Sequence, residues 1–282
     1  MSHPPRLGIF AKTFPGNAPG AVLSAVAAAG YGAAHYNMAC SGLAAMPDDI
    51  PAVTAKSIAD AAAASGVTIV GVSGTWNMIH PDPAIRDTGM RRLDVLAKAC
   101  STIGTRLITL CTGTRDPDDQ WRAHPDNATP EAWRALLAGM ERAVVIAERY
   151  DVDLGIELEL ANVVDSAMKA RELIDEIGSP RLKIVLDPAN LAEVETPERR
   201  RAIVAGAIDV LADHIAMAHA KDRDARGDFV AAGRGVIDFP HFLGALQTAG
   251  FSGPLVAHGL SAAEAPAAAA FLRRTASEAD WR

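Results

Sequence analysis

The 282-residue sequence contains little cysteine, and the cysteines that it has are scattered. Cys40, Cys100 and Cys111 form neither a Cys-x-x-Cys pair nor a dense framework. A disulfide-stapled secreted scaffold would need both more cysteines and closer spacing. The pattern indicates free thiols in a reducing compartment, and we predict a cytoplasmic protein.

Long apolar runs are also missing. No stretch of about 18 apolar residues occurs, because Asp, Ser and Gly interrupt the Ala-rich segments. Residues 1–10 lack the apolar core of a signal peptide. These absences predict a soluble protein that has no membrane partner.

The third shortage is basic charge. Lys and Arg number 27 against 34 Asp and Glu, which gives a net charge of −7. Nucleic-acid-binding proteins carry basic stripes, often interleaved with aromatic residues, and no such stripe is visible here. We therefore expect no nucleic-acid partner, although the net charge does not exclude a local basic patch.

Apolar residues, by contrast, make up 49% of the chain, and segments typical of strands and helices alternate along it. Eight strand–helix pairs without a linker favour a closed (β/α)8 TIM barrel over an open doubly wound sheet. The first strand–helix turn also lacks the G-x-G-x-x-G of dinucleotide-binding sheets. We predict one barrel domain over residues 1–282. The expected strands are 7–10, 33–37, 68–72, 106–111, 153–159, 182–186, 215–220 and 254–257. The expected helices are 19–29, 52–65, 87–103, 130–150, 165–177, 197–212, 239–248 and 262–276. Residues 221–238 are expected to form a charged loop, too polar to be core.

Four consecutive predicted strands end in residues that can bind a metal or transfer a proton: Glu157, Asp187, His219 and His258. One acid at a strand end is more often a helix cap or a loop ion pair. Four such ends in a row favour a shared site, because the strand ends of a barrel converge. Two carboxylates and two imidazoles suit one divalent ion. We expect Mn²⁺, with Co²⁺, Fe²⁺, Zn²⁺ or Mg²⁺ as alternatives.

Three segments then resemble the xylose-isomerase-like barrels, a superfamily of sugar isomerases and epimerases. They are Ile156-Glu157-Leu158-Glu159, Val185-Leu186-Asp187-Pro188-Ala189-Asn190 and His219-Ala220-Lys221-Asp222. The resemblance implies that Glu157, Asp187 and His219 are metal ligands and that Glu157 is also an acid/base. The chain departs from the family at His258, where its epimerases usually place a glutamate, and at Asn190, where some ketose epimerases carry a substrate-binding histidine.

The resulting hypothesis is an isomerase or epimerase that transfers a proton next to a carbonyl of a sugar, ketose or polyol-derived substrate. Glu157 and His258 are the expected catalytic pair, and Lys221 or Arg223 would stabilise the developing charge. Further substrate contacts are expected from Glu159, Asn190, Asn77, His80, Arg115 and Trp121.

Three alternatives stay open. One is a dehydratase of an inosose-like substrate on the same site. Another is an apurinic-type endonuclease, for which His80 and His124 would add zinc ligands. The third is a barrel that binds a ligand without turnover. His35 lies on a predicted strand and could face the barrel, but a buried core histidine is the expectation. The family resemblance implies a homo-oligomer, either a dimer or a tetramer.

Overall fold

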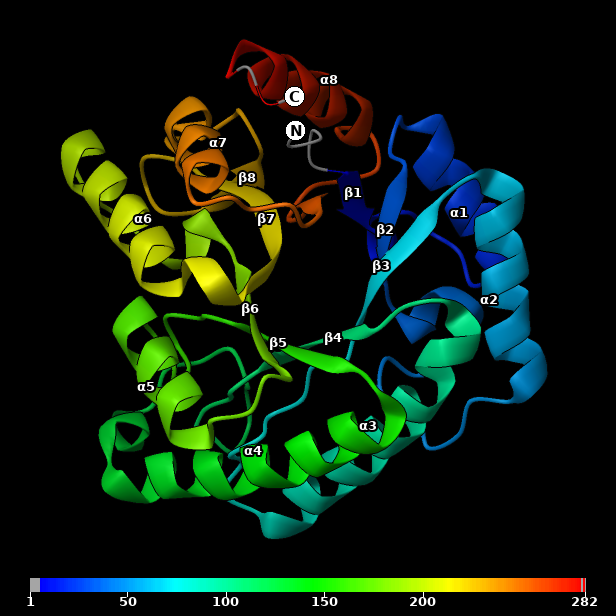
Figure 1. Cartoon of the computed structure of the whole chain (residues 1–282), viewed down its shortest axis with the longest axis vertical. Helices are drawn as coiled ribbons and strands as arrows, with labels where there is room; N and C mark the ends of the chain where they lie inside the picture. Colours follow the sequence, from blue (N-terminus) through cyan, green and yellow to red (C-terminus); the bar gives the residue numbers. More distant parts are fainter. Residues whose placement is uncertain (1–5, 280, 282) are drawn as a thin grey trace.

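Eight parallel strands close into a barrel in the computed structural model, which describes residues 6–279 and 281. Each strand pairs with the next, and the ring closes where β1 pairs with β9 and β6 pairs with β7. Figure 1 shows the strands inside a ring of helices. The barrel strands are β1 (Leu7–Phe10), β2 (Ala33–Tyr36), β3 (Thr68–Ser73), β4 (Leu107–Cys111), β5 (Asp153–Glu157), β6 (Leu182–Leu186), β7 (Ile215–Arg223) and β9 (Leu255–Ala257).

The helices follow the predicted pattern. They are α1 (Pro19–Ala28), α2 (Ala52–Ser65), α3 (Pro83–Ile103), α4 (Pro130–Tyr150), α5 (Ala167–Ile177), α6 (Pro197–Leu211), α7 (Phe239–Thr248) and α8 (Ala265–Glu278). Short 3-10 turns are η1 (Ala11–Thr13), η2 (Met38–Ser41), η3 (Pro125–Ala128), η4 (Pro188–Asn190) and η5 (Ala212–His214). Within the described ranges, no helix is long and apolar enough to cross a bilayer.

Side-chain caps fix where several helices begin. Thr129 and Thr196 each accept a hydrogen bond from a backbone N–H three residues on, directly before a proline at the first helical position. Helix α3 begins at Pro83 rather than at the predicted residue 87, because the carboxylate of Asp82 accepts the Ala84 N–H. The predicted start was wrong there because the capping aspartate was overlooked.

An apolar floor fills the barrel beneath the strand ends. It consists of Leu107, Val185, Met217 and Val256, which are buried against one another. Glycines on neighbouring strands make room for these side chains. A Cβ atom on Gly155 would lie 2.9 Å from Val185 Cγ2, and one on Gly71 would lie 3.2 Å from Met217 Cε. The floor closes the barrel from below, so a ligand can enter only from the carboxyl ends of the strands.

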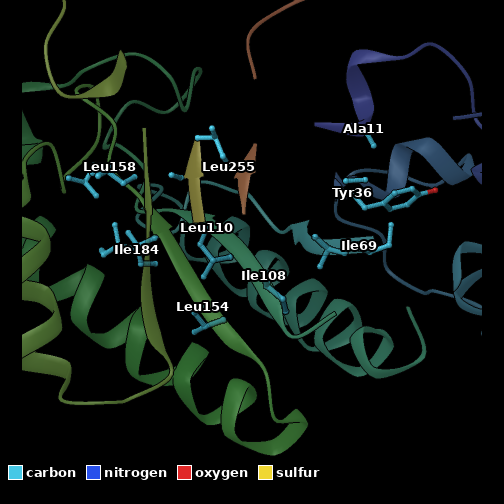
Figure 2. Close-up of a cluster of buried hydrophobic side chains, with 14 of the residues drawn as sticks. Ala11, Tyr36, Ile69, Ile108, Leu110, Leu154, Leu158, Ile184 and Leu255 are labelled. Atoms are coloured by element: carbon cyan, nitrogen blue, oxygen red, sulfur yellow. The ribbon is translucent and has the colours of Figure 1, made fainter. Parts of the chain in front are cut away.

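A larger apolar core lies between the barrel wall and the helices. Residues of β4, β5 and β6 whose side chains leave the barrel, such as Ile108, Leu154 and Ile184, belong to it and are fully or almost fully buried. Figure 2 shows this layer, with Leu110 and Leu158 in the same cluster. Alternation along each strand therefore sends apolar residues outward to the helices and leaves the inward positions at the strand ends for polar groups.

The loop prediction for residues 221–238 was wrong in part. Strand β7 continues to Arg223 and pairs antiparallel with β8 (Phe229–Ala231), which places Arg223 opposite Phe229. Lys221, Asp222 and Arg223 are all buried. The carboxylate of Asp222 accepts backbone N–H groups of residues 233, 235 and 237, which folds this polar segment back over the barrel. The polarity of this segment had predicted an exposed loop, but the Asp222 carboxylate can be buried because these hydrogen bonds satisfy it.

Candidate active site

Three predicted metal-binding residues meet in the barrel mouth: Glu157 is the last residue of β5, Asp187 follows β6, and His219 lies midway along β7, which extends beyond the barrel to Arg223. His219 Nδ1 lies 3.0 Å from Glu157 Oε1 and 3.7 Å from Asp187 Oδ2. One ligand-type atom from each of the three lies within 4.8 Å of the others. These segments are 30 or more residues apart in sequence, and barrel closure brings them together.

The backbone aims each of these groups inward. Glu157 and His219 follow Gly155 and Met217 by two residues, so they lie on the inner face of their strands above the apolar floor. Asp187 follows β6 and caps η4, because its Oδ1 accepts the Ala189 N–H at 2.9 Å. That bond uses one carboxylate oxygen and leaves Oδ2 to face His219.

Several buried polar atoms at this point have no hydrogen-bond partner among the described residues: Asp187 Oδ2, His219 Nε2, His258 Nδ1 and His35 Nδ1. Buried polar atoms are almost always paired, so unpaired ones mark a place where another group binds. The separations of 3.0 and 3.7 Å join Glu157 Oε1 and Asp187 Oδ2 to His219 Nδ1, the ring nitrogen opposite the unpaired Nε2, and they suit ligands that share one ion at about 2.1 Å each. Glu157, Asp187 and His219 therefore fit a divalent ion that prefers mixed oxygen and nitrogen ligands.

The same cluster is electrostatically coupled. Burial acts to raise the pKa of Glu157, but the imidazole of His219 and its hydrogen bond outweigh that and hold the pKa below its usual range. Burial acts to lower the pKa of His219, and the carboxylates of Glu157 and Asp187 raise it well above its usual range. The carboxylates of Glu157 and Asp187 therefore favour positive charge at this point, which a proton on His219 or a metal ion on its neutral ring can supply.

Asn190 joins the cluster to the predicted substrate-binding residues. Its Nδ2 donates to Glu157 Oε1 at 3.2 Å and to Glu159 Oε1 at 2.8 Å, and its Oδ1 accepts from Lys221 Nζ at 3.1 Å. Burial and the charge of Glu157 raise the pKa of Glu159. Lys221 Nζ also lies 3.8 Å from Asp187 Oδ2. One amide thus orients both glutamates and the lysine.

His258 lies beside the cluster. Its ring stacks on Phe10 with a centroid separation of 4.7 Å and on His219 with one of 5.1 Å. In the part of the chain that the structure describes, His258 is not in the group of ligand atoms that lie within 4.8 Å of one another. Burial, followed by the charge of His219, lowers the pKa of His258 to about 4, so its imidazole is neutral at pH 7. This placement suits a proton-transfer group better than a fourth ligand.

A cavity of about 570 Å³ opens above these groups. Glu157, Glu159, Lys221, Arg223 and His258 line it, together with Trp121 from the loop after β4. Trp121 is 52% exposed, so its indole lies at the mouth. Arg223 is held in place by hydrogen bonds from its guanidinium to the carbonyls of residues 189 and 227.

The loops after β3 and β4 use the other predicted residues differently. Asn77 bonds both the N–H and the carbonyl of Thr114, His80 contacts the carbonyl of Pro117, and Arg115 donates to the carbonyl of Ile79. Of the residues described, the lining of the cavity does not include Asn77, His80 or Arg115. Their polar atoms hold the two loops together, and the structure does not bring them to the cluster.

Some cavity residues escaped the sequence analysis. Phe10, Lys12 and Phe229 line the cavity, and so does His35, whose Nε2 lies 2.9 Å from Thr109 Oγ1. His35 is buried as expected, but it faces the cavity rather than the outer core. Its place on a predicted strand had left a barrel-facing orientation open as the alternative, and His35 takes that orientation in the structure. Phe229 gave no signal, because its strand was not predicted.

The closed barrel and the polar cluster at its carboxyl ends define a class of protein, the TIM barrels with a site at the strand ends. A family model described as "Xylose isomerase-like TIM barrel" matches residues 23–275. The chain therefore belongs to the xylose isomerase-like TIM-barrel family, as the three segments had indicated.

Relatives in that family have epimerase names. The chain is 26% identical over 203 residues to L-ribulose-5-phosphate 3-epimerase UlaE of Escherichia coli, an alignment that covers 71% of the chain and 64% of that protein. Among solved structures, L-ribulose 3-epimerase superposes with a TM-score of 0.77 at 19% identity, covering 98% of this chain and 96% of that one. The 3-keto-D-glucoside 4-epimerase YcjR of E. coli superposes with a TM-score of 0.76 at 14% identity, covering 95% and 99%. At these identities the structural likeness establishes the fold.

Proposed function

We propose that the protein is a metal-dependent isomerase or epimerase that transfers a proton next to the carbonyl of a sugar, ketose or polyol-derived substrate. The observation that carries the proposal is the cluster of Glu157, Asp187 and His219, whose separations suit one shared cation. The curated relatives support it, because they are named as sugar epimerases, although the chain spans only 64% of their length.

A divalent ion held by Glu157, Asp187 and His219, for which Mn²⁺ is our first expectation, would polarise the substrate's carbonyl and its neighbouring hydroxyl. The protein's own groups then move the proton. The carboxylate of Glu157 and the neutral imidazole of His258 both line the cavity, and both begin as bases. Glu157 removes the proton from the carbon, while His258 takes the proton of the neighbouring hydroxyl and delivers it to that carbon; protonated Glu157 then restores the hydroxyl, so each group ends in its starting form. Lys221 Nζ stabilises the negative charge that develops on the substrate oxygen.

The surrounding residues position the reacting groups. Asn190 holds Glu157, Glu159 and Lys221 in one network, and Trp121 covers the mouth. Glu159, with its raised pKa, can bind a substrate hydroxyl as a protonated carboxyl group. Arg223 completes the cationic side of the cavity.

The dehydratase alternative uses the same first step, and only the fate of a neighbouring hydroxyl separates it from epimerisation. The endonuclease alternative has less support, because backbone groups of the loops after β3 and β4 engage both His80 and His124. A cytoplasmic location and a homodimer or homotetramer remain predictions, and light scattering of the purified protein tests the second.

The test is a screen of ketoses, inososes and small hydroxy-ketones with Mn²⁺ in D₂O, followed by NMR. We expect deuterium at the carbon next to the carbonyl and a new isomer, while a product lighter by one water would identify the dehydratase. The matched control is Glu157→Gln, which preserves the shape of the side chain and should abolish exchange. Full exchange in that variant, or none with any substrate in the wild type, would contradict the proposal.

A further inference from the structure

A second cavity, which is shallow and largely open to solvent, adjoins the first at the ends of β1 and β9. Its volume is about 500 Å³, and it shares Phe10, Lys12, Phe229 and His258 with the first cavity of about 570 Å³. Small-molecule sites usually measure about 300–1,000 Å³. Each cavity is therefore large enough for a sugar ring, and the two together can hold a longer molecule.

Phe229 forms a platform on this shared boundary. Lys221 Nζ and Arg223 Cζ lie 3.5 and 3.9 Å from the centre of its ring. The two cations are two residues apart on β7 and thus project to the same side of the strand. Phe229 is nevertheless 46% exposed, so part of the residue remains open to a ligand. Aromatic faces present the flat apolar surface on which the C–H face of a sugar packs.

The charges around the second cavity balance. Lys12 is its one cation and Glu264 its one carboxylate among the described lining residues. The carboxylate is already occupied, because Ser261 donates to it from both its N–H and its Oγ, at 2.9 and 2.6 Å. A phosphate needs several converging donors or cations, and this cavity does not supply an excess of positive charge.

We infer that the natural substrate is an uncharged carbohydrate larger than a monosaccharide. Its keto sugar lies over Glu157 in the first cavity, and a second sugar ring or another glycosidic substituent lies across Phe229 in the second. This inference rests on the proposed function, since it extends the substrate of that same site.

The experiment measures kcat/KM for exchange in D₂O with three probes: free ketohexoses, ketohexose 6-phosphates, and 6-O-glucosyl ketohexoses such as isomaltulose. We expect the glucosyl compounds to exceed both other classes at least tenfold. Equal or better turnover of the free or phosphorylated sugars would overturn the inference and leave the proposed function standing. Absence of exchange with all three classes would count against the proposed function itself.

Two variants sharpen the result. Thr13 lines only the second cavity, so Thr13→Trp should fill it and lower the ratio of glucosyl to free-sugar kcat/KM at least tenfold, while Thr13→Ser should not change the ratio. Phe229→Ala should raise KM for the glucosyl substrate more than it changes kcat. Phe229→Tyr keeps an aromatic platform and should keep KM near that of the wild type. An unchanged ratio in both Thr13→Trp and Phe229→Ala would overturn the inference.

Discussion

The two sides of the barrel mouth carry similar polar residues and use them in opposite ways. After β3 and β4, Asn77 and His80 spend their polar atoms on backbone groups of the same loops. At the ends of β6 and β7, Asp187 and His219 each keep one buried polar atom without a hydrogen-bond partner in the described ranges. We interpret the first side as a scaffold and the second as the candidate site. Trp76 Nε1, after β3, is also buried without a partner, so the distinction lies in the grouping: Asp187 and His219 lie beside each other and beside Glu157.

The largest expected effect of a substitution on the site side belongs to Glu157. Glu157→Gln keeps the volume and the hydrogen bond from Asn190 but removes the base, so we expect kcat to fall by about 10³-fold. The melting temperature should change little. Quenched assays of deuterium exchange in D₂O measure kcat, and thermal unfolding measures the melting temperature. A variant with wild-type kcat would show that this side is also scaffold.

Asn190 should have the next largest effect. Asn190→Ala releases Glu159 and Lys221, and partners that orient metal-site groups typically contribute about 10–100-fold in activity. We expect a loss in that range, mainly in kcat. A change confined to stability, measured by urea unfolding, would move Asn190 to the scaffold side of the comparison.

Asn77 should give the reverse pattern. Asn77→Ala leaves the buried N–H and carbonyl of Thr114 without their partner, which costs about 2 kcal/mol of unfolding free energy. The kcat of the folded fraction should stay near that of the wild type. If kcat fell strongly while stability held, Asn77 would be a substrate contact, as the sequence analysis expected.

The smallest effect concerns the loop that carries Trp121. Hydrogen bonds from Arg122, and then from the N–H groups of residues 118 and 119, hold the pKa of Asp116 well below its usual range. Because contacts in the folded loop lower the pKa of Asp116, its ionised carboxylate stabilises the loop at pH values above the usual aspartate pKa of about 4. That stabilisation is lost as the pH falls below this value. The protection factors of the loop amides, which correct for the intrinsic slowing of exchange in acid, should therefore fall below about pH 4. Asp116→Asn should exchange faster at neutral pH already, and a wild-type loop insensitive to acid would contradict this account.

Much of this molecule follows from its sequence, for physical reasons. Alternating strands and helices predict the barrel, and parallel strands place Glu157, Asp187 and His219 at one end of it. The side-chain partners of Asn77 and His80 could not be predicted, because they depend on how two loops pack against each other. Strand β8 was missed because the buried Asp222 is satisfied by N–H groups more than ten residues away. His258 was expected in the cluster, and the stacking on Phe10 and His219 that places it alongside is not visible in a sequence.

The account depends on one claim, that three strand ends share a single cation. The most direct test is to measure Mn²⁺ binding to the purified 282-residue chain, by calorimetry and by the EPR signal of free Mn²⁺. Asp187→Asn is the matched variant, because its Oδ1 can still accept the Ala189 N–H while the second oxygen becomes an amide. His124→Asn is the control from the scaffold side. The account predicts one ion per chain in the wild type and in His124→Asn, and at least 100-fold weaker binding in Asp187→Asn; no binding by the wild type, or unchanged binding by Asp187→Asn, would contradict it.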